Sequence, residues 1–277
     1  MLSIALGLGV VAIVFWIWRK QSVRKGLGFT FHWWVFGDFS AGVLVAAIAM
    51  TLVFLIELAI GAIQVTGFSF DLATLSARAG WFVYGAFFEE FIFRSLMLSG
   101  IVAVLMLLAY VRLKLSPGLI KWLAIAISAA AFGYAHFNNP GATAITIFGT
   151  GLGGLMYGVA FLGGRNIWLP VGLHFGWNFF QGNIFGFPVS GTIEPSLILQ
   201  QAVGADVWTG GAYGPEAGLI GMASRFVVIA LLLYYLYWRS HRKGSIERLD
   251  FPIKIYDNPS RREQERQRAS SDAQLTF

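Results

Sequence analysis

Long hydrophobic segments recur along the chain and alternate with shorter polar connections. A helix needs about 20 apolar residues to cross a bilayer, and the pattern supplies windows close to that length. The predicted spans cover roughly residues 2–18, 39–63, 80–110, 122–137, 142–162, 167–186 and 217–238. The alternation typical of barrel strands is absent, and open sheet edges do not occur in hydrocarbon. The pattern therefore predicts an all-α fold, a polytopic transmembrane helical bundle of about seven spans.

The composition is typical of a membrane protein. Of the 277 residues, 57% are hydrophobic and 12% are charged, whereas a soluble domain has about 25% charged residues. The net charge of +6 is concentrated in short connections and in the C-terminal tail, which indicates membrane topology rather than nucleic-acid binding. Because the chain has no cysteine, disulfides, thiolate metal ligands and a cysteine nucleophile are excluded.

The basic residues are distributed unequally between the connections. They follow the first, third, fifth and last segments, and the connections after the fourth and sixth segments have none. The basic residues concerned are Arg19, Lys20, Arg24, Lys25, Arg112, Lys114, Lys121, Arg165, Arg239, Arg242 and Lys243. By the positive-inside rule we expect a multi-pass protein of a prokaryotic cytoplasmic membrane, with its N-terminus outside and its C-terminus cytoplasmic. The first segment lacks a basic leading region and a cleavage site, which favours a retained anchor.

Three charged residues lie within the third hydrophobic segment, in the stretch YGAFFEEFIFRS. A charge at the bilayer centre costs about 2.5–3.5 kcal/mol, so these residues need a reason to be there. Glu90 and Arg94 are four positions apart, share a helix face and can form an ion pair. Glu89 lies about 100° away around the helix, and we expect it to face another helix or water.

Two histidines and an asparagine lie at comparable depth in other segments. His136 ends the fourth segment, and His174 and Asn178 share one face of the sixth. Taken singly, such residues are often structural ion pairs, interfacial side chains or interhelical hydrogen-bonding groups. Together with Glu89 they are the components of a general base with electrophilic stabilisers.

These groups allow two hydrolytic arrangements. Without a metal, Glu89 and His136 would take a proton from water, and no cofactor would be needed. His174 and Asn178 would then bind the developing oxyanion. With a divalent metal such as zinc, Glu89, His136 and His174 would supply an oxygen and two nitrogens. The HExxH motif of zinc proteases and the G-x-S-x-G elbow of serine hydrolases are both absent from the sequence.

The segment GTGLGG, residues 149–154, satisfies the dinucleotide-binding pattern G-x-G-x-x-G. That pattern requires a preceding strand, whereas this segment lies within a predicted span. Gly149 and Gly153, and then Gly154 and Gly158, have the spacing that allows membrane helices to approach closely. We therefore predict helix packing here rather than nucleotide binding.

The polar motifs resemble those of a known family. The sequence contains E-E-x-x-x-R at Glu89–Arg94, F-x-x-x-H at Phe132–His136 and H-x-x-x-N at His174–Asn178, in this order on three hydrophobic segments. This set resembles the CAAX protease and bacteriocin-processing (CPBP, or Abi) family of intramembrane endopeptidases, which includes the Ras-converting CAAX endopeptidases. The resemblance covers about residues 79–186.

The resemblance implies a role for each motif residue. Glu89 would be the water-activating base with His136 beside it, and His174 and Asn178 would form the oxyanion site or help to hold a metal. The supporting residues would be Glu90, Arg94 and Phe132.

The expected organisation follows from these assignments. N-terminal transmembrane helices and loops cover residues 1–78, and the CPBP-like catalytic core covers 79–186. A non-cytoplasmic loop at 187–216, a final transmembrane helix at 217–238 and a polar, flexible cytoplasmic tail at 239–277 follow. The expected partners are a peptide or membrane-protein substrate and the lipid bilayer, without nucleic acid.

Two other functional classes compete with the protease hypothesis. A non-catalytic membrane adaptor or chaperone could keep the same fold, but it has no need of Glu89, His136 and His174 together. A transporter is disfavoured because the sequence shows no internal repeat and no paired broken helices.

Overall fold

The computed structural model describes residues 1–31, 33–111 and 115–242, and it describes side chains as far as residue 239. The long elements are α1 (Leu2–Trp18), α3 (Trp34–Ala59), α4 (Leu72–Glu90), α5 (Ser99–Val111), α6 (Pro117–Ala135), α7 (Ala144–Gly164), α8 (Trp168–Phe179) and α10 (Leu219–Arg242). The short helices are α2 (Val23–Gly26), α9 (Asp206–Thr209), and the 3₁₀ turns η3 (Gly211–Tyr213) and η4 (Pro215–Ala217). Two π-helical segments, η1 (Phe91–Leu98) and η2 (Phe180–Ile184), and two strands, β1 (Ile63–Phe68) and β2 (Ile198–Ala202), complete the chain.

The predicted helical membrane bundle is confirmed, although the number of spans differs. In the described part of the chain, five helical segments are long and apolar enough to cross a membrane. They are α3, the continuous α4–η1–α5 segment of 40 residues, α6, α7 and α10. The remaining two predicted spans correspond to α1, with 17 residues, and to α8 with its π-helical extension η2. Both are shorter than the roughly 20 residues of a typical bilayer-spanning helix.

Several helices begin at a residue whose side chain caps the first turn. Asp71 precedes α4 and accepts hydrogen bonds from the backbone N–H groups of Ala73 and Thr74. At the start of α7, Thr143 and Thr146 form a reciprocal capping box. Such side chains satisfy N–H groups that the helix itself leaves without partners.

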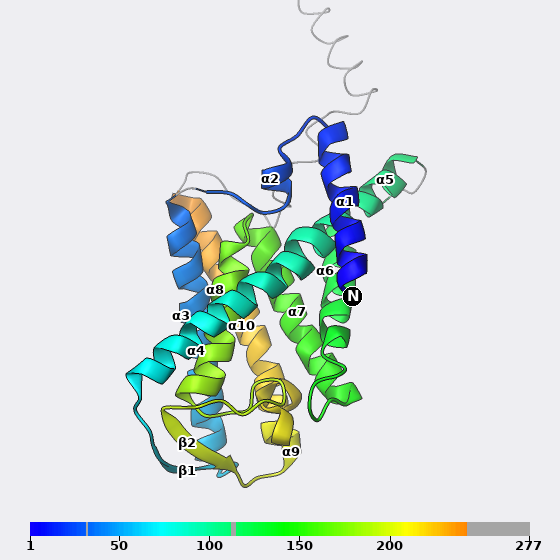
Figure 1. Ribbon diagram of the computed structural model, residues 1–277. Coiled ribbons are helices and arrows are strands. Elements are labelled where there is room, and N and C mark those ends of the chain that lie inside the picture. Colours follow the sequence, from blue (N-terminus) through cyan, green and yellow to red (C-terminus); the bar gives the residue numbers. More distant parts are fainter. Residues whose placement is uncertain (32, 112–114, 243–277) are drawn as a thin grey trace, which may run out of the picture.

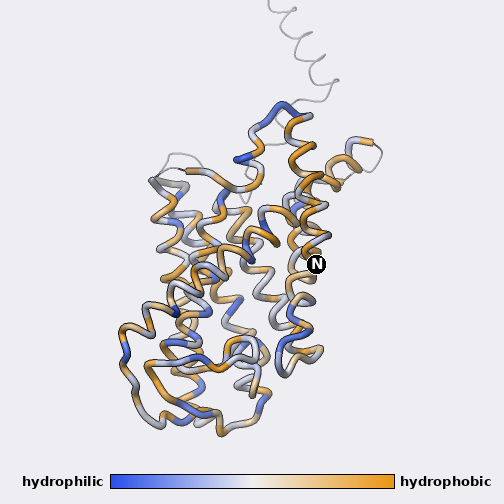
Figure 2. Tube along the Cα trace, in the orientation of Figure 1, coloured by the Kyte–Doolittle hydropathy of each residue, from blue (hydrophilic) through white to orange (hydrophobic). Residues whose placement is uncertain are grey.

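The bundle is arranged in closely packed helix pairs. α3 packs along α8, α6 packs along α7, and α10 contacts both α3 and α7. Figure 1 shows α4 crossing the bundle obliquely before it continues into η1 and α5. Hydrophobic positions dominate the helices, and hydrophilic stretches are most evident in the connections at the two ends of the bundle (Figure 2).

The glycine-rich segment GTGLGG lies entirely within α7, so the helix-packing prediction is confirmed. A Cβ atom at Gly154 would lie 2.9 Å from the Cα atom of Ala129 in α6, and one at Gly158 would lie 3.1 Å from the Ile125 side chain. A Cβ atom at Gly149 would collide with the backbone oxygen of Glu216. The glycines therefore allow close approach on two faces of α7.

A small antiparallel sheet departs from the all-α prediction. β1 pairs with β2 from Ile63 opposite Ala202 to Phe68 opposite Ile198, with an irregularity between Val65 and Gly67. The prediction placed residue 63 in a helix and residues 187–216 in a loop. The chain leaves α3 through Gly61, whose φ of 70° suits glycine. The two strands are too short, and too far apart in the sequence, to show a clear pattern.

The connection between η2 and α10 is tied to the bundle at several points. Glu194 forms an ion pair with Arg78 of α4. Asn183 donates a hydrogen bond to the Pro195 carbonyl at 2.7 Å, and Asn139 donates one to the Ser190 carbonyl at 3.2 Å. This predicted loop is therefore a packed cap that covers one end of the helices.

A buried polar cluster joins the helices near the opposite end. Asp38 of α3 accepts hydrogen bonds from Tyr235 at 2.7 Å, from Arg239 at 2.8 Å and from Asn166 at 2.6 Å. These bonds join α3 to α10 and to the turn between α7 and α8. The predicted tail at 239–277 overlaps the end of α10, and residues 243–277 lie outside the described part of the chain.

Candidate active site

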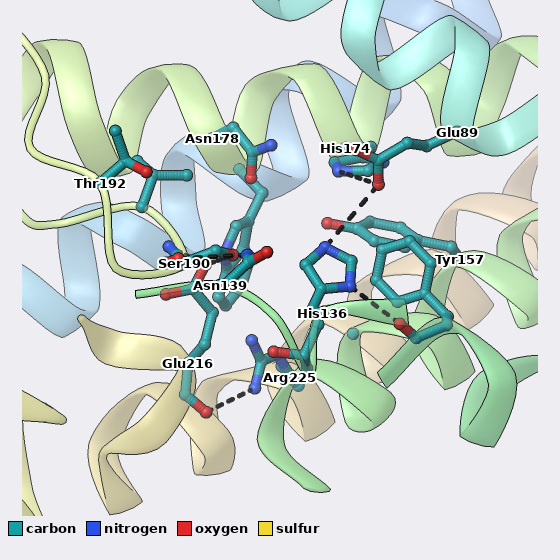
Figure 3. A pocket seen from close by; sticks show the side chains of 15 residues that line it. Glu89, His136, Asn139, Tyr157, His174, Asn178, Ser190, Thr192, Glu216 and Arg225 are labelled. Atoms are coloured by element: carbon teal, nitrogen blue, oxygen red, sulfur yellow. Dashed lines mark hydrogen bonds and ion pairs between the residues drawn. The ribbon is translucent and has the colours of Figure 1, made fainter. Parts of the chain in front are cut away.

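The four residues predicted to do chemistry line one cavity of about 160 Å³. Glu89 comes from the end of α4, His136 directly follows α6, and both His174 and Asn178 lie on α8. Figure 3 shows Glu89, His136 and His174 directed toward one another, with Asn178 one turn further along α8. Residues separated by up to 89 positions are thus brought together by helix packing alone.

Glu89 directs one carboxylate oxygen toward both histidines. Its Oε2 atom lies 3.9 Å from Nε2 of His136 and 4.0 Å from Nε2 of His174. These separations exceed the length of a direct hydrogen bond, and Oε2 has no hydrogen-bond partner among the described residues. The side chain as a whole is 38% exposed, so Glu89 borders the cavity without being fully enclosed.

The hydrogen bonds of the two histidines determine which ring nitrogens face Glu89. Nδ1 of His136 lies 2.8 Å from the backbone oxygen of Phe132. A carbonyl oxygen only accepts, so Nδ1 carries the proton, and a neutral His136 ring presents the lone pair of Nε2 to Glu89. Nδ1 of His174 lies 2.8 Å from Oε1 of Glu90, and this carboxylate likewise accepts a hydrogen bond from the ring N–H group.

Glu90 and Arg94 form the ion pair expected from their spacing. The Arg94 Nε atom lies 3.1 Å from Glu90 Oε2, and both side chains are completely buried. Arg94 also donates a hydrogen bond to the Gly154 carbonyl at 3.0 Å. Its guanidinium carbon lies 4.6 Å from the centre of the Phe132 ring and 5.2 Å from that of Tyr157. Phe132 therefore contacts Arg94 with its ring and His136 with its carbonyl oxygen.

A π-helical turn begins immediately after Glu90. The sequence predicts only a continuous helix in this region, and π-turns within helices occur frequently at functional sites. The turn lies between Glu90 and the rest of the third span, and it contains Arg94. The local widening therefore begins directly after Glu90, the residue that contacts His174.

Several residues of the cavity wall were not predicted from the sequence. They are Asn139, Thr150, Gly153, Tyr157, Trp177, Val189, Ser190, Thr192, Glu216 and Arg225. Thr150, Gly153 and Tyr157 recur at intervals of three and four along α7, a spacing that indicates a shared helix face. The glycines of this helix predict helix packing, and the sequence alone does not show that Thr150 and Tyr157 face a cavity. The residues from the cap have no periodic signal.

The cavity wall next to the cap contains a buried carboxyl group, that of Glu216, and a buried guanidinium group, that of Arg225. Glu216 accepts hydrogen bonds from Gln181 at 2.7 Å and from the Ser190 hydroxyl at 3.1 Å. Burial raises the pKa of Glu216, and nearby Arg225 opposes that shift. Arg225 donates to the Gly149 carbonyl at 2.6 Å, and its guanidinium lies 5.0 Å from the centre of the Trp177 ring.

The described residues contain no group of three His, Cys, Asp or Glu side chains that could hold a metal ion. Glu89, His136 and His174 share a cavity, but both nitrogen–oxygen separations are close to 4 Å. Ligands that share a zinc ion at bonds of about 2.0–2.2 Å lie closer together than this. Glu89 and the two histidines are therefore not at zinc-ligand spacing in this structure.

The fold and the cavity together define an integral membrane protein with an internal polar site. Residues 71–180 match the family model described as Type II CAAX prenyl endopeptidase Rce1-like. This match covers less than half of the chain, and it agrees with the resemblance to the CAAX protease family that the three motifs carry. The matched segment contains all seven motif residues from Glu89 to Asn178. No curated protein and no solved structure matches the chain.

Proposed function

We propose that the protein is an intramembrane endopeptidase that hydrolyses a peptide bond of a membrane-associated protein or peptide. The observation that carries this proposal is the position of Glu89 Oε2 at 3.9 and 4.0 Å from two imidazole nitrogens, in a cavity also lined by Asn178. The family's description as a prenyl endopeptidase supports a peptide or protein substrate.

The separation between Glu89 and His136 suits an activated water molecule. Two groups about 4 Å apart can be bridged by one water with two hydrogen bonds of ordinary length. Glu89 and the Nε2 lone pair of His136 both accept, so together they orient the water and leave its oxygen lone pair free for attack. Glu89 takes the proton as the water oxygen bonds to the carbonyl carbon.

The electron pair of the carbonyl π bond moves to the carbonyl oxygen and creates an oxyanion. Asn178 donates to this oxygen through its amide, and His174 donates through Nε2 when its ring is protonated. The hydrogen bond from His174 Nδ1 to Glu90 holds the ring with Nε2 toward Glu89.

The tetrahedral intermediate then collapses. The carbon–nitrogen bond breaks with its electron pair on nitrogen, and the proton held by Glu89 passes to that nitrogen. A carboxylic acid and an amine result, and Glu89 is again a carboxylate. Glu90 contacts His174, and Phe132 contacts both histidines. Arg94 contacts Glu90 and Phe132, so the role of these three residues is to hold the two rings in place.

We also propose the orientation that the loop charges indicate, with the N-terminus outside and the C-terminus cytoplasmic. In Figure 1 the connection after α1, the end of α5 and the end of α10 lie toward the same end of the bundle. The cap lies at the other end and supplies Ser190 and Thr192 to the cavity wall. The core proposed for residues 79–186 therefore carries the four reactive groups, and the cap and α10 complete the wall.

Replacement of Glu89 by Gln tests this function. The change keeps the volume of the side chain and removes the base, so cleavage of a prenylated peptide ending in a CAAX sequence should fall by about 10²–10⁴-fold. His136→Ala should have a comparable effect. The purified variants are assayed in lipid vesicles, and their melting temperatures should equal that of the wild type within a few degrees.

Two other outcomes separate the alternatives. If Glu89→Gln cleaves like the wild type, the carboxylate is not the base, and the adaptor hypothesis replaces the protease. Loss of wild-type cleavage on addition of a chelator, restored by zinc, would replace the glutamate-only mechanism with the metal-dependent variant of the same hydrolysis.

A further inference from the structure

The cavity presents more hydrogen-bond acceptors than donors near Glu89. The carboxylate of Glu89 only accepts hydrogen bonds. The Nδ1–H group of His136 already donates a hydrogen bond to the backbone carbonyl of Phe132. His174 donates its Nδ1 proton to Glu90. An oxyanion formed here requires donors, and a neutral His174 ring offers none at Nε2.

Tyr157 is a polar side chain of the cavity wall to which neither the motifs nor the mechanism above assign a role. It lies on α7, and only 3% of its surface is exposed. Its ring stacks on His174 with centroids 4.5 Å apart and an interplanar angle of 17°. It also meets the Phe132 ring edge to face at 5.8 Å. These contacts hold the ring on two sides.

The hydroxyl of Tyr157 is directed into the site. Figure 3 shows it pointing toward the space bordered by Glu89, His136 and His174. Within the described part of the chain, no side chain or backbone group forms a hydrogen bond with this hydroxyl. The Tyr213 hydroxyl, by contrast, lies 3.3 Å from Thr150 Oγ1.

Tyr157 lines the cavity, and its hydroxyl is not one of the fully buried polar atoms that lack a partner, so it can donate a hydrogen bond to a molecule bound there. Phenylalanine would provide the same stacking on His174 and the same contact with Arg94 without this donor. The stacking therefore explains the ring but not the hydroxyl. A group that carries negative charge during the reaction would give this hydroxyl its partner.

We propose that Tyr157 is a further catalytic residue, whose hydroxyl donates a hydrogen bond to the oxyanion of the substrate. The proposal rests on the endopeptidase function proposed above. Tyr157 donates as a neutral group, whereas His174 donates from Nε2 only in its protonated form. With Asn178 it would provide two donors that do not depend on the protonation of an imidazole.

Tyr157→Phe removes only the hydroxyl. The variant is assayed in lipid vesicles with the prenylated CAAX peptide beside the wild type, Glu89→Gln and Tyr213→Phe. Loss of one oxyanion donor predicts a fall in kcat of about 10²-fold, with KM and melting temperature unchanged. Tyr213→Phe also removes a buried tyrosine hydroxyl, but one outside the group around Glu89, and its kcat should equal that of the wild type.

The results distinguish this inference from the function on which it rests. If Glu89→Gln is inactive and Tyr157→Phe keeps the wild-type kcat, Tyr157 is not a catalytic donor but the protease mechanism stands. If Tyr157→Phe lowers the melting temperature and raises KM without lowering kcat, its role is structural and the inference is wrong. A fully active Glu89→Gln would overturn the proposed function itself.

Discussion

Glu89 and Glu90 are neighbours in the sequence, but their carboxylates lie in opposite surroundings. Glu90 is completely buried, and its two oxygens face Arg94 at 3.1 Å and His174 at 2.8 Å. Glu89 is 38% exposed and has no partner within hydrogen-bond distance on the oxygen that faces the two histidines. One carboxylate is thus fixed by its partners, and the other borders the cavity.

The difference shows how a bundle can hold a reactive acid in an apolar environment. A buried charge needs a paired charge and hydrogen bonds, and Glu90 has both. Its contacts also orient His174, which lies next to Glu89. The support side, defined as Glu90 and Arg94, is a buried ion pair. The cavity side, defined as Glu89, His136, His174 and Asn178, lines the cavity in which we propose that the chemistry takes place.

The largest expected effect on folding comes from breaking the support side. Arg94→Ala leaves Glu90 without its cation, and removal of one member of a buried pair destabilises a protein by about 3–5 kcal/mol. Both the yield of folded protein and the cleavage activity should fall. Size-exclusion chromatography, melting temperature and peptide cleavage measure these effects.

The double variant Glu90→Gln with Arg94→Gln removes both charges at once and should recover much of the yield. Arg94→Ala with normal yield and normal cleavage would show that the pair supports neither the fold nor the site.

A smaller effect, confined to activity, is expected on the cavity side. Asn178→Ala removes one oxyanion donor and should lower kcat by about 10²–10³-fold. Its melting temperature should stay close to that of the wild type, because Asn178 is only partly buried. A variant that loses stability instead of activity would place Asn178 among the supporting residues.

The smallest effect concerns the pH dependence of stability. Burial raises the pKa of Glu216 from its ordinary value of 4.5, so the folded protein holds this proton at pH values where the unfolded chain has released it. Stability from this group is therefore present below pH 4.5 and is lost as pH rises through the raised pKa. The slope is at most about 1.4 kcal/mol per pH unit.

Glu216→Gln should remove that contribution, and melting temperatures measured across a pH series detect the change. An identical pH profile in the variant and the wild type would show that the pKa of Glu216 is the same in the folded and the unfolded protein.

Most of the helices and five of the cavity residues could be predicted from the sequence. Hydrophobic segments reveal helices because a bilayer imposes their length, and the cost of charge in lipid draws attention to Glu89 and His174. The partnership of Glu90 with Arg94 followed from helical spacing. These are local signals that need no knowledge of packing.

Other features depend on contacts between distant segments and could not be predicted. The pairing of Ile63 with Ala202 joins strands that are separated in the sequence by residues 69–197. The Asp38 cluster uses Tyr235 and Arg239, residues at the far end of α10. Tyr157 looks like any packed aromatic residue in a glycine-rich helix until its hydroxyl is seen in the cavity.

The matched pair Glu89→Gln and Glu90→Gln tests the division between the two sides most directly. Each change removes one charge from adjacent positions, and both variants are measured for peptide cleavage and for melting temperature in the same preparation. We predict that Glu89→Gln loses at least about 10²-fold in cleavage and keeps its melting temperature. Glu90→Gln should lower the melting temperature, because Arg94 then lies buried without its anion. An inactive, fully stable Glu90→Gln beside an active Glu89→Gln would contradict the account.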